Sequence, residues 1–268
     1  MEGGVVSEVV ESKSPHLHPG DTVLAYTGWQ EYAAVPAKAV RKLDSNAAPV
    51  STALGVLGMP GMTAYTGLLN IGQPKAGETV VVAAAAGAVG SVVGQIAKIK
   101  GCRAVGIAGR PEKCAYVRGE LGFDACIDHN SSGFRRELKS ACPDGIDVYF
   151  ENVGGAVLEA VVPLLNPFAR VPVCGLIAHY NASAPPEGPN QVPLLMAAIL
   201  TRRLTFRGFI VTDYSSQAAD FQRDMSGWIR EGRVKYREDI VDGLENAVSA
   251  FQGLLKGRNF GKLLVRVN

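Results

Sequence analysis

The sequence predicts an α/β protein built on a doubly wound parallel sheet, with a smaller, incomplete antiparallel β-barrel-like part formed by its two ends. Two observations lead to this prediction. The run 79–83 is apolar, short enough to be a strand buried on both faces, and breaks at a stretch of Ala and Gly. From this run onward, strand-like and helix-like segments alternate, with six strands in all counting 79–83 itself. Crossover helices between successive strands imply parallel pairing.

The central elements follow from this alternation in chain order. Apolar runs bounded by turn residues predict strands at 79–83, 103–108, 125–128, 146–150, 171–174 and 204–210. The segments between them predict helices from the glycine turn through 100, at 111–120, 134–141 and 156–165, and around 194–202.

The turn after the first of these strands reads Ala85-Ala86-Gly87-Ala88-Val89-Gly90, a form of GxGxxG with alanine in the first glycine position. Gly87 lets the backbone approach a phosphate, Gly90 lets the helix pack tightly on the strand, and the helix N-terminus offers free amides. Alone, such a turn is either a dinucleotide site or a small-residue turn without a ligand. The strand before it and the helix and strand after it favour the dinucleotide site.

The end of the second strand indicates which dinucleotide is bound. NAD enzymes place an acidic residue about 20 residues past the loop, on the ribose hydroxyls. This chain has Gly109-Arg110 and then Lys113 there, and these cations attract a 2′-phosphate that a carboxylate would repel. We therefore expect NADPH, although either cation by itself could simply solvate the start of the next helix.

Composition excludes several other classes of protein. The 268 residues carry a net charge of +2 with interspersed signs, so no basic stripe indicates a nucleic-acid partner. No apolar run reaches membrane-spanning length, and the N-terminus lacks the basic and apolar regions of a signal peptide, so we expect no membrane partner and a cytoplasmic location. The five cysteines stand singly, without a CxxC pair or a nearby His, and predict no metal site.

The flanking segments differ in character from the centre. Residues 1 to about 45 indicate short antiparallel strands punctuated by Pro and Gly, and the tail resembles them more than it resembles the central sheet. We expect one part at 1–48, a Rossmann domain at 49–233, and a return to the first part at 234–268. The proline-rich stretch 185–189 predicts an exposed loop, either inert or a lid.

Six stretches distributed along the chain resemble the zinc-independent branch of the medium-chain dehydrogenase/reductase family, which contains prostaglandin reductases and bacterial curcumin reductases. They are GVLGMPGMTAY (55–65), AAAGAVGSVVG (84–94), FENVGG (150–155), CGLI (174–177), GFIV (208–211) and GRNFGK (257–262). The similarity runs from end to end, and the set is far more specific than any one member.

Carried over position by position, the resemblance implies a set of cofactor-binding residues. Gly87 to Gly90 would hold the pyrophosphate and Lys113 the 2′-phosphate, while His129 falls where prostaglandin reductases have a tyrosine. The full set is Thr63, Gly87, Ala88, Val89, Gly90, Gly109, Arg110, Lys113, His129, Asn152, Cys174, Gly175, Leu176, Ile177, Tyr180, Phe209, Ile210, Val211 and Asn259. For 209–211, ordinary sheet core is the alternative interpretation.

The reaction that this resemblance implies is reduction of an α,β-unsaturated ketone or aldehyde. Without Cys and His ligands for zinc, the site lacks the Lewis acid of an alcohol dehydrogenase. An enone instead needs hydride at its β-carbon and a donor for the enolate oxygen, and a tyrosine keeps its proton at neutral pH. Tyr214 is the first candidate and Tyr180 the second, although a solvated loop tyrosine is equally compatible with either position.

Two other functions stay open. A quinone reductase would use the same hydride donor, and a catalytically silent NADPH-binding protein would need no substrate site. The resemblance implies that 1–48 and the returning segment 234–268 form a partial substrate domain of the GroES-like type. Members of the family normally begin about 70 residues earlier, with strands that complete the substrate barrel, so an incomplete and partly open site is expected. The family also implies a homodimer through the sheet edge, at 204–210.

Overall fold

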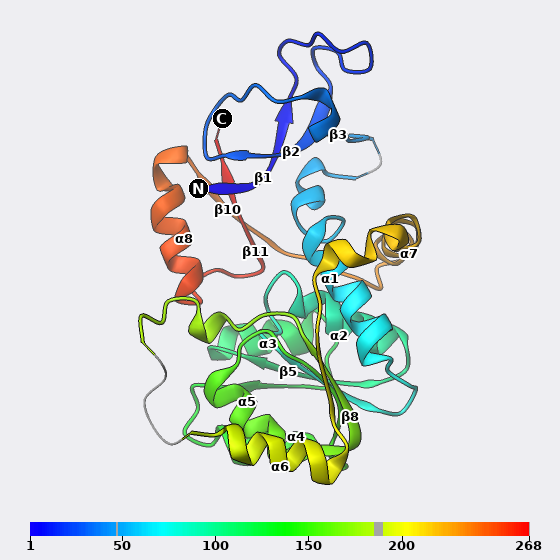
Figure 1. The fold of residues 1–268 in the computed structure, drawn as a ribbon, viewed down its shortest axis with the longest axis vertical. Coiled ribbons are helices and arrows are strands. Elements are labelled where there is room, and N and C mark those ends of the chain that lie inside the picture. Colours follow the sequence, from blue (N-terminus) through cyan, green and yellow to red (C-terminus); the bar gives the residue numbers. More distant parts are fainter. Residues whose placement is uncertain (47, 185–189, 268) are drawn as a thin grey trace.

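A computed structural model describes residues 1–46, 48–184 and 190–267 (Figure 1). Its centre is a six-stranded parallel sheet with the strand order β6-β5-β4-β7-β8-β9. The strands are β4 (Thr79–Ala83), β5 (Arg103–Ala108), β6 (Ala125–Asp128), β7 (Ile146–Phe150), β8 (Leu165–Val173) and β9 (Thr205–Gly208). The predicted doubly wound parallel sheet is confirmed, and its order reverses between β4 and β7.

Alternating side chains of the strands feed two separate cores. Val80 and Val82 of β4 pack on one face, whereas Val81 and Ala83 pack on the other. All five residues of this strand are buried, as expected for a parallel strand that helices cover on both sides.

Helices cover both faces of the sheet. The first face is covered by α1 (Met59–Thr66), α2 (Gly90–Ile99), α3 (Pro111–Gly119) and α7 (Ala218–Arg230). The second face is covered by α4 (Phe134–Ala141), α5 (Gly155–Val161) and α6 (Val192–Arg202), which lie below the sheet in Figure 1.

Two predicted boundaries around β8 are wrong, and both errors involve a proline. The predicted helix 156–165 ends as α5 at Val161 and continues only as a 3-10 turn, Val162–Leu164, because Pro163 lacks the N–H of a helix interior. The strand predicted from Val171 already begins at Leu165. Its first part contains Pro167 and Phe168, where φ is +64°, and the pairing with β7 shifts register there.

The N-terminal residues form a small antiparallel sheet at the top of Figure 1. It contains β1 (Glu2–Glu8), β2 (Thr22–Gly28) and the short β3 (Arg41–Lys42), in that order. The C-terminal residues form a second small sheet from β10 (Glu238–Asp242) and β11 (Lys262–Arg266). This pair is parallel, unlike the antiparallel pattern expected for the ends, because helix α8 (Ala247–Leu255) crosses over between its strands.

Hydrogen bonds just before β10 and just before β11 join the C-terminal sheet to the central sheet and its helices. The Gln95 side chain in α2 bonds both the carbonyl and the amide of Lys235, each at 2.8 Å. The Gly261 amide donates to the Ala86 carbonyl at 3.1 Å. The proposed division at 48/49 and 233/234 falls between the three sheets and stays a prediction, and the proline-rich stretch 185–189 lies outside the described residues.

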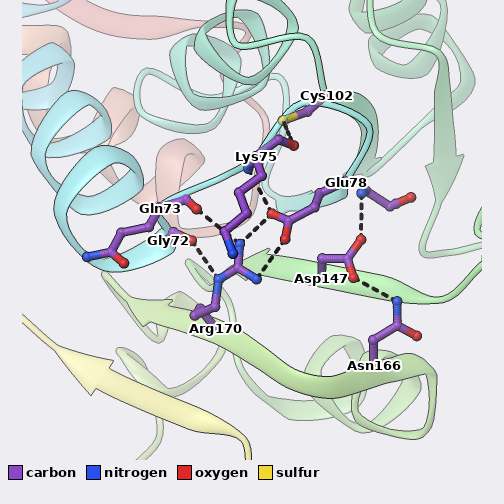
Figure 2. A network of polar contacts seen from close by, with 9 residues as sticks. Gly72, Gln73, Lys75, Glu78, Cys102, Asp147, Asn166 and Arg170 are labelled. Atoms are coloured by element: carbon purple, nitrogen blue, oxygen red, sulfur yellow. Dashed lines mark hydrogen bonds and ion pairs between the residues drawn. The ribbon is translucent and has the colours of Figure 1, made fainter.

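A polar network ties β8 to the segment that leads into β4 (Figure 2). The Arg170 guanidinium donates to the Gly72 and Gln73 carbonyls at 2.9 and 3.1 Å and to the Glu78 carboxylate at 3.1 Å through Nη1, and its Nη2 forms an ion pair with the same carboxylate. The backbone amide of Lys75 also donates to Glu78, at 2.8 Å. Partial burial opposes ionisation of Glu78, but these hydrogen bonds outweigh it and lower its pKa below 4.5.

The same end of the sheet has a second carboxylate clamp. Asp147 of β7 accepts the Thr79 amide at 2.9 Å and the Asn166 side-chain amide at 2.8 Å. The two clamps therefore hold β4, β7 and β8 together at one end of the sheet.

Among the residues that the structure describes, none of the helices combines the length and the apolar character needed to cross a membrane.

Replacing Arg170 with Met should destabilise the fold by about 2 kcal/mol at neutral pH, because Glu78 would stay half-buried without its cation. Glu78 has a lowered pKa, so its contribution is complete above 4.5 and is lost as the pH falls through the folded-state pKa. The stability difference between the wild type and Arg170→Met should therefore shrink below pH 4.5. Urea unfolding over a pH series measures it.

Arg103→Met is the matched control. Arg103 is also half-buried but donates to the Ala141 carbonyl, at 3.0 and 3.2 Å, rather than to a carboxylate. The difference in unfolding free energy between Arg103→Met and the wild type should therefore stay the same when Glu78 becomes protonated at low pH. A constant gap for Arg170→Met across the whole series would contradict the assignment of Glu78 as its partner.

Candidate functional site

A cleft of about 2240 Å³ runs along the carboxyl ends of the parallel strands and continues upward between the two small sheets. Its lower wall comes from the segments that follow β4, β5, β6, β7 and β8. Its upper wall comes from β1, β2, α8 and β11. The cleft therefore opens where the strand order reverses, the position at which open α/β sheets bind ligands.

The glycine turn forms the floor of this cleft. Gly87 and Gly90 both line it, and Gly90 is also buried at the start of α2. A Cβ on Gly90 would lie 2.4 Å from the Ala84 carbonyl oxygen, so only glycine lets α2 begin this close to the end of β4. The amides of Ala88 and Val89 find no acceptor among the described residues, which leaves two donors at the helix N-terminus for an anion.

Packing explains the alanine in the first glycine position. Ala85 is fully buried and faces Gly106 of β5, where an added Cβ would lie 2.8 Å from the Ala85 methyl. The methyl that Ala85 adds thus fills space that Gly106 leaves empty. Gly87 is less constrained, since its nearest neighbour would be the Ala84 oxygen at 3.2 Å.

The residues expected to hold a 2′-phosphate meet at the end of β5. Arg110 has φ +79° and ψ +143°, a backbone conformation that costs a non-glycine residue of the order of 1–3 kcal/mol. Its guanidinium is exposed and approaches Glu112 only to 3.8 Å. The strained residue therefore presents a cation at the cleft.

Lys113 lies beside it in the first turn of α3 and is buried. Its Nζ donates to the Gly257 carbonyl at 2.8 Å, and burial together with the charge of Arg110 lowers its pKa. A phosphate between these cations would attract both of them and so favour the charged form of Lys113. His129 and Gly109 complete this part of the lining, with Asn130, which the sequence interpretation missed although it directly follows His129.

The opposite end of the lower wall is formed by the loops after β7 and β8. The Asn152 side chain donates to the Ala83 carbonyl at 2.8 Å and so ties the end of β7 to the end of β4. Asn152, Cys174, Gly175, Ile177 and Tyr180 all line the cleft. Burial, with a smaller effect of Glu151, raises the pKa of Cys174 to about 11, so this thiol keeps its proton at neutral pH.

The structure brings most of the predicted residues together. Those that line the cleft are Gly87, Ala88, Val89, Gly90, Gly109, Arg110, Lys113, His129, Asn152, Cys174, Gly175, Ile177, Tyr180 and Asn259. Those that are not part of this lining are Thr63, Leu176, Phe209, Ile210, Val211 and Tyr214. Thr63 donates within its own helix to the Met59 carbonyl at 2.8 Å, and Phe209 packs edge-on against Phe150 at 6.4 Å.

The two candidate tyrosines lie in different places. Tyr180 is 62% exposed, lines the cleft, and its hydroxyl oxygen accepts the Leu176 amide at 3.4 Å. Tyr214 is half-buried outside the lining, with its ring edge-on to Phe209 at 6.3 Å. Of the pair, Tyr180 is therefore the one with direct access to the cleft.

The sequence interpretation missed the aromatic upper wall. Trp29, just after β2, meets Phe251 of α8 edge-on at 5.9 Å, and both line the cleft. No local pattern marks this pair, since its members come from opposite ends of the chain.

Within 1–46, 48–184 and 190–267, no three His, Cys, Asp or Glu side chains lie together in a way that could hold a metal ion.

Comparison with known proteins agrees with this geometry. A family model described as zinc-binding dehydrogenase matches residues 88–230, and one described as the N-terminal domain of an oxidoreductase matches residues 1–43. The chain is 56% identical over 268 residues to NADPH-dependent curcumin reductase of Escherichia coli (strain K12), covering all of this chain and 78% of that protein. The chain belongs to the zinc-independent branch of the medium-chain dehydrogenase/reductase family.

Other members of this medium-chain family match over almost the same length. Prostaglandin reductase 1 of Rattus norvegicus is 43% identical over 272 residues, with 99% of this chain and 81% of that protein covered. The crystal structure of CurA in complex with NADPH from Vibrio vulnificus superimposes with a TM-score of 0.96 at 53% identity, covering 100% of this chain and 80% of that one. The predicted family resemblance is confirmed.

Proposed function

We propose that the protein is an NADPH-dependent reductase that saturates the carbon–carbon double bond of α,β-unsaturated ketones or aldehydes. One observation carries this proposal: the glycine turn and the Arg110–Lys113 cation pair line one cleft, in a chain 56% identical to an NADPH-dependent curcumin reductase. Two relatives are named as reductases of curcumin and of prostaglandins, and these names support the substrate assignment.

The residues of the cleft fit this cofactor. The amides of Ala88 and Val89 would hold the pyrophosphate, and Arg110 and Lys113 the 2′-phosphate. Asn152, the lining residues among 174–178 and Asn259 would hold the rest of the dinucleotide. When bound, the reduced nicotinamide supplies the hydride that the reaction needs.

For the proton chemistry we propose Tyr180, because its hydroxyl lies in the cleft and can donate to a developing enolate oxygen. Tyr214 stays a candidate only if the loop that carries it approaches the substrate when ligands bind. The aromatic upper wall supplies apolar surface for the substrate.

Lys113→Ala should weaken NADPH binding about 10- to 100-fold and leave NADH binding nearly unchanged, because a charge-assisted hydrogen bond to the 2′-phosphate is lost. Titration calorimetry with both cofactors measures this. Lys98→Ala is the control, since Lys98 pairs with Asp124 at 2.9 Å and does not line the cleft. Equal losses for NADPH and NADH would count against a 2′-phosphate site at Lys113.

Tyr180→Phe should lower kcat for an enone roughly 10- to 100-fold with NADPH binding retained, because a single donor to the developing negative charge is removed. Tyr214→Phe should change kcat little. NADPH oxidation with an enone, a quinone and no acceptor compares the variants and also separates the reductase from a quinone reductase and from a silent binding protein. Full turnover by Tyr180→Phe would remove this hydroxyl from the mechanism.

We also propose that the protein forms a homodimer through the edge of its central sheet. Strand β9 is an edge strand, and the neighbouring helix α6 exposes apolar side chains at Val192, Leu194, Met196 and Leu200. Sedimentation should show a dimer that Leu200→Lys converts toward monomer, while Lys139→Glu on α4 leaves it intact. A monomeric wild type would contradict the proposal.

The five free thiols fit the expected cytoplasmic location.

A further inference from the structure

One buried acid at the cleft has no role in the function proposed above. Glu151 directly follows β7, is 1% exposed, and lies next to Asn152 of the cleft wall. Its Oε1 accepts the amides of Val153 and Gly154 at 2.6 and 2.9 Å. A buried carboxyl is costly to maintain, so its position calls for a physical reason.

The two amides belong to a turn that organises the whole wall. The Glu151 carbonyl accepts the amides of Cys174 and Gly175, and the carbonyls of Asn152 and Val153 accept those of Ile177 and Ala178, at 2.9–3.2 Å. Glu151 and the two residues after it thus join the end of β7 to residues 174–178 through four backbone hydrogen bonds. Moving the turn would therefore move the wall.

The turn has a conformation that does not form easily by itself. Gly154 has φ +77°, and an added Cβ would lie 3.1 Å from His179 and 3.2 Å from Leu176. The Glu151 side chain holds the amide of this glycine and the one before it. The carboxyl therefore selects one conformation for a segment that glycine alone would leave adjustable.

The second carboxyl oxygen shows that the group is not there for a salt bridge. Glu151 Oε2 and the hydroxyl of Tyr149 are both buried, and neither makes a well-formed hydrogen bond among the described residues, but the two groups lie close enough together that each affects the pKa of the other. Burial raises the pKa of Glu151, although the amides of Val153 and Gly154 oppose this rise. The described hydrogen bonds of the Glu151 side chain are therefore those that Oε1 accepts from the turn.

We propose that Glu151 is a positioning residue, whose Oε1 fixes the 152–154 turn and thereby holds Asn152 and the 174–178 wall in place for the nicotinamide cofactor. This inference rests on the proposed function, because it gives the fixed wall its purpose. It makes a separable claim about the apo protein, namely that the acceptor oxygen keeps the turn and the wall ordered.

The test compares substitutions that keep or remove this oxygen. Glu151→Gln keeps an acceptor at the same reach, Glu151→Leu removes it, and Glu151→Asp keeps the charge but shortens the reach by one methylene. Tyr149→Phe is the matched control, since it removes the buried hydroxyl near Glu151 and leaves in place the Oε1 acceptor that binds the turn amides. Thermal unfolding identifies any variant that fails to fold, in which case Glu151→Asp replaces Glu151→Leu.

Two measurements are made on each folded variant. Hydrogen–deuterium exchange without cofactor should be faster in segments 150–158 and 174–184 of Glu151→Leu and Glu151→Asp, and unchanged in Glu151→Gln and Tyr149→Phe. The Kd for NADPH should rise at least about tenfold in Glu151→Leu and Glu151→Asp, and less than about threefold in Glu151→Gln and Tyr149→Phe. In an enone assay, the KM for NADPH should rise more than kcat falls.

The outcomes are distinguishable. Normal exchange and normal NADPH binding in Glu151→Leu would overturn the inference, as would equal losses in Glu151→Leu and Glu151→Gln. If the wild type bound no NADPH, the proposed function would fail, and the exchange measurement would still decide whether Glu151 orders the turn.

Discussion

Helix α2 can begin where it does only because Gly90 has no side chain, and this close approach determines much of the surrounding structure. With the helix this near the end of β4, its next glycine, Gly94, meets the ring of Phe123, where a Cβ would lie 1.8 Å from Cζ. Across the strand, Gly106 makes room for Ala85. Three glycines and one alanine therefore bring the helix N-terminus to the floor of the cleft, where its amides face any bound anion.

The cleft combines this preformed floor with electrostatic and conformational stress. Arg110 is held in a backbone conformation that non-glycine residues avoid, and burial, with a smaller effect of the Arg110 charge, lowers the pKa of Lys113. A bound anion would relieve the repulsion between the cations. The strained backbone of Arg110 and the desolvated cation of Lys113 thus lie at the place that we propose for the 2′-phosphate, and strained or electrostatically perturbed groups are common in binding sites.

The parts of the fold that could be predicted from sequence are those that local patterns specify. Residues Arg103–Ala108 and Ile146–Phe150 were predicted as strands with the bounds observed, because buried parallel strands are continuous apolar runs that end at turn residues. The start of β8 was missed because Asn166-Pro167 is typical of a turn, and only pairing with β7 makes it a strand. In the site, Arg110 and Lys113 could be located because they follow a strand end. The position of Tyr180 relative to Tyr214, and the meeting of Trp29 with Phe251, depend on how distant segments pack and leave no local signal.

The backbone contact between Gly261 and the glycine turn has an energetic consequence for the molecule as a whole. Gly261 pairs with Gly87 in an isolated bridge and donates its amide to Ala86, while Gly257, in the same segment, accepts from Lys113. The C-terminal segment therefore shares hydrogen bonds with the glycine turn and with Lys113, so one cannot come apart without disturbing the other. By thermodynamic linkage, a ligand that binds the glycine turn and Lys113 while these bonds are formed also suppresses local opening of strand β11.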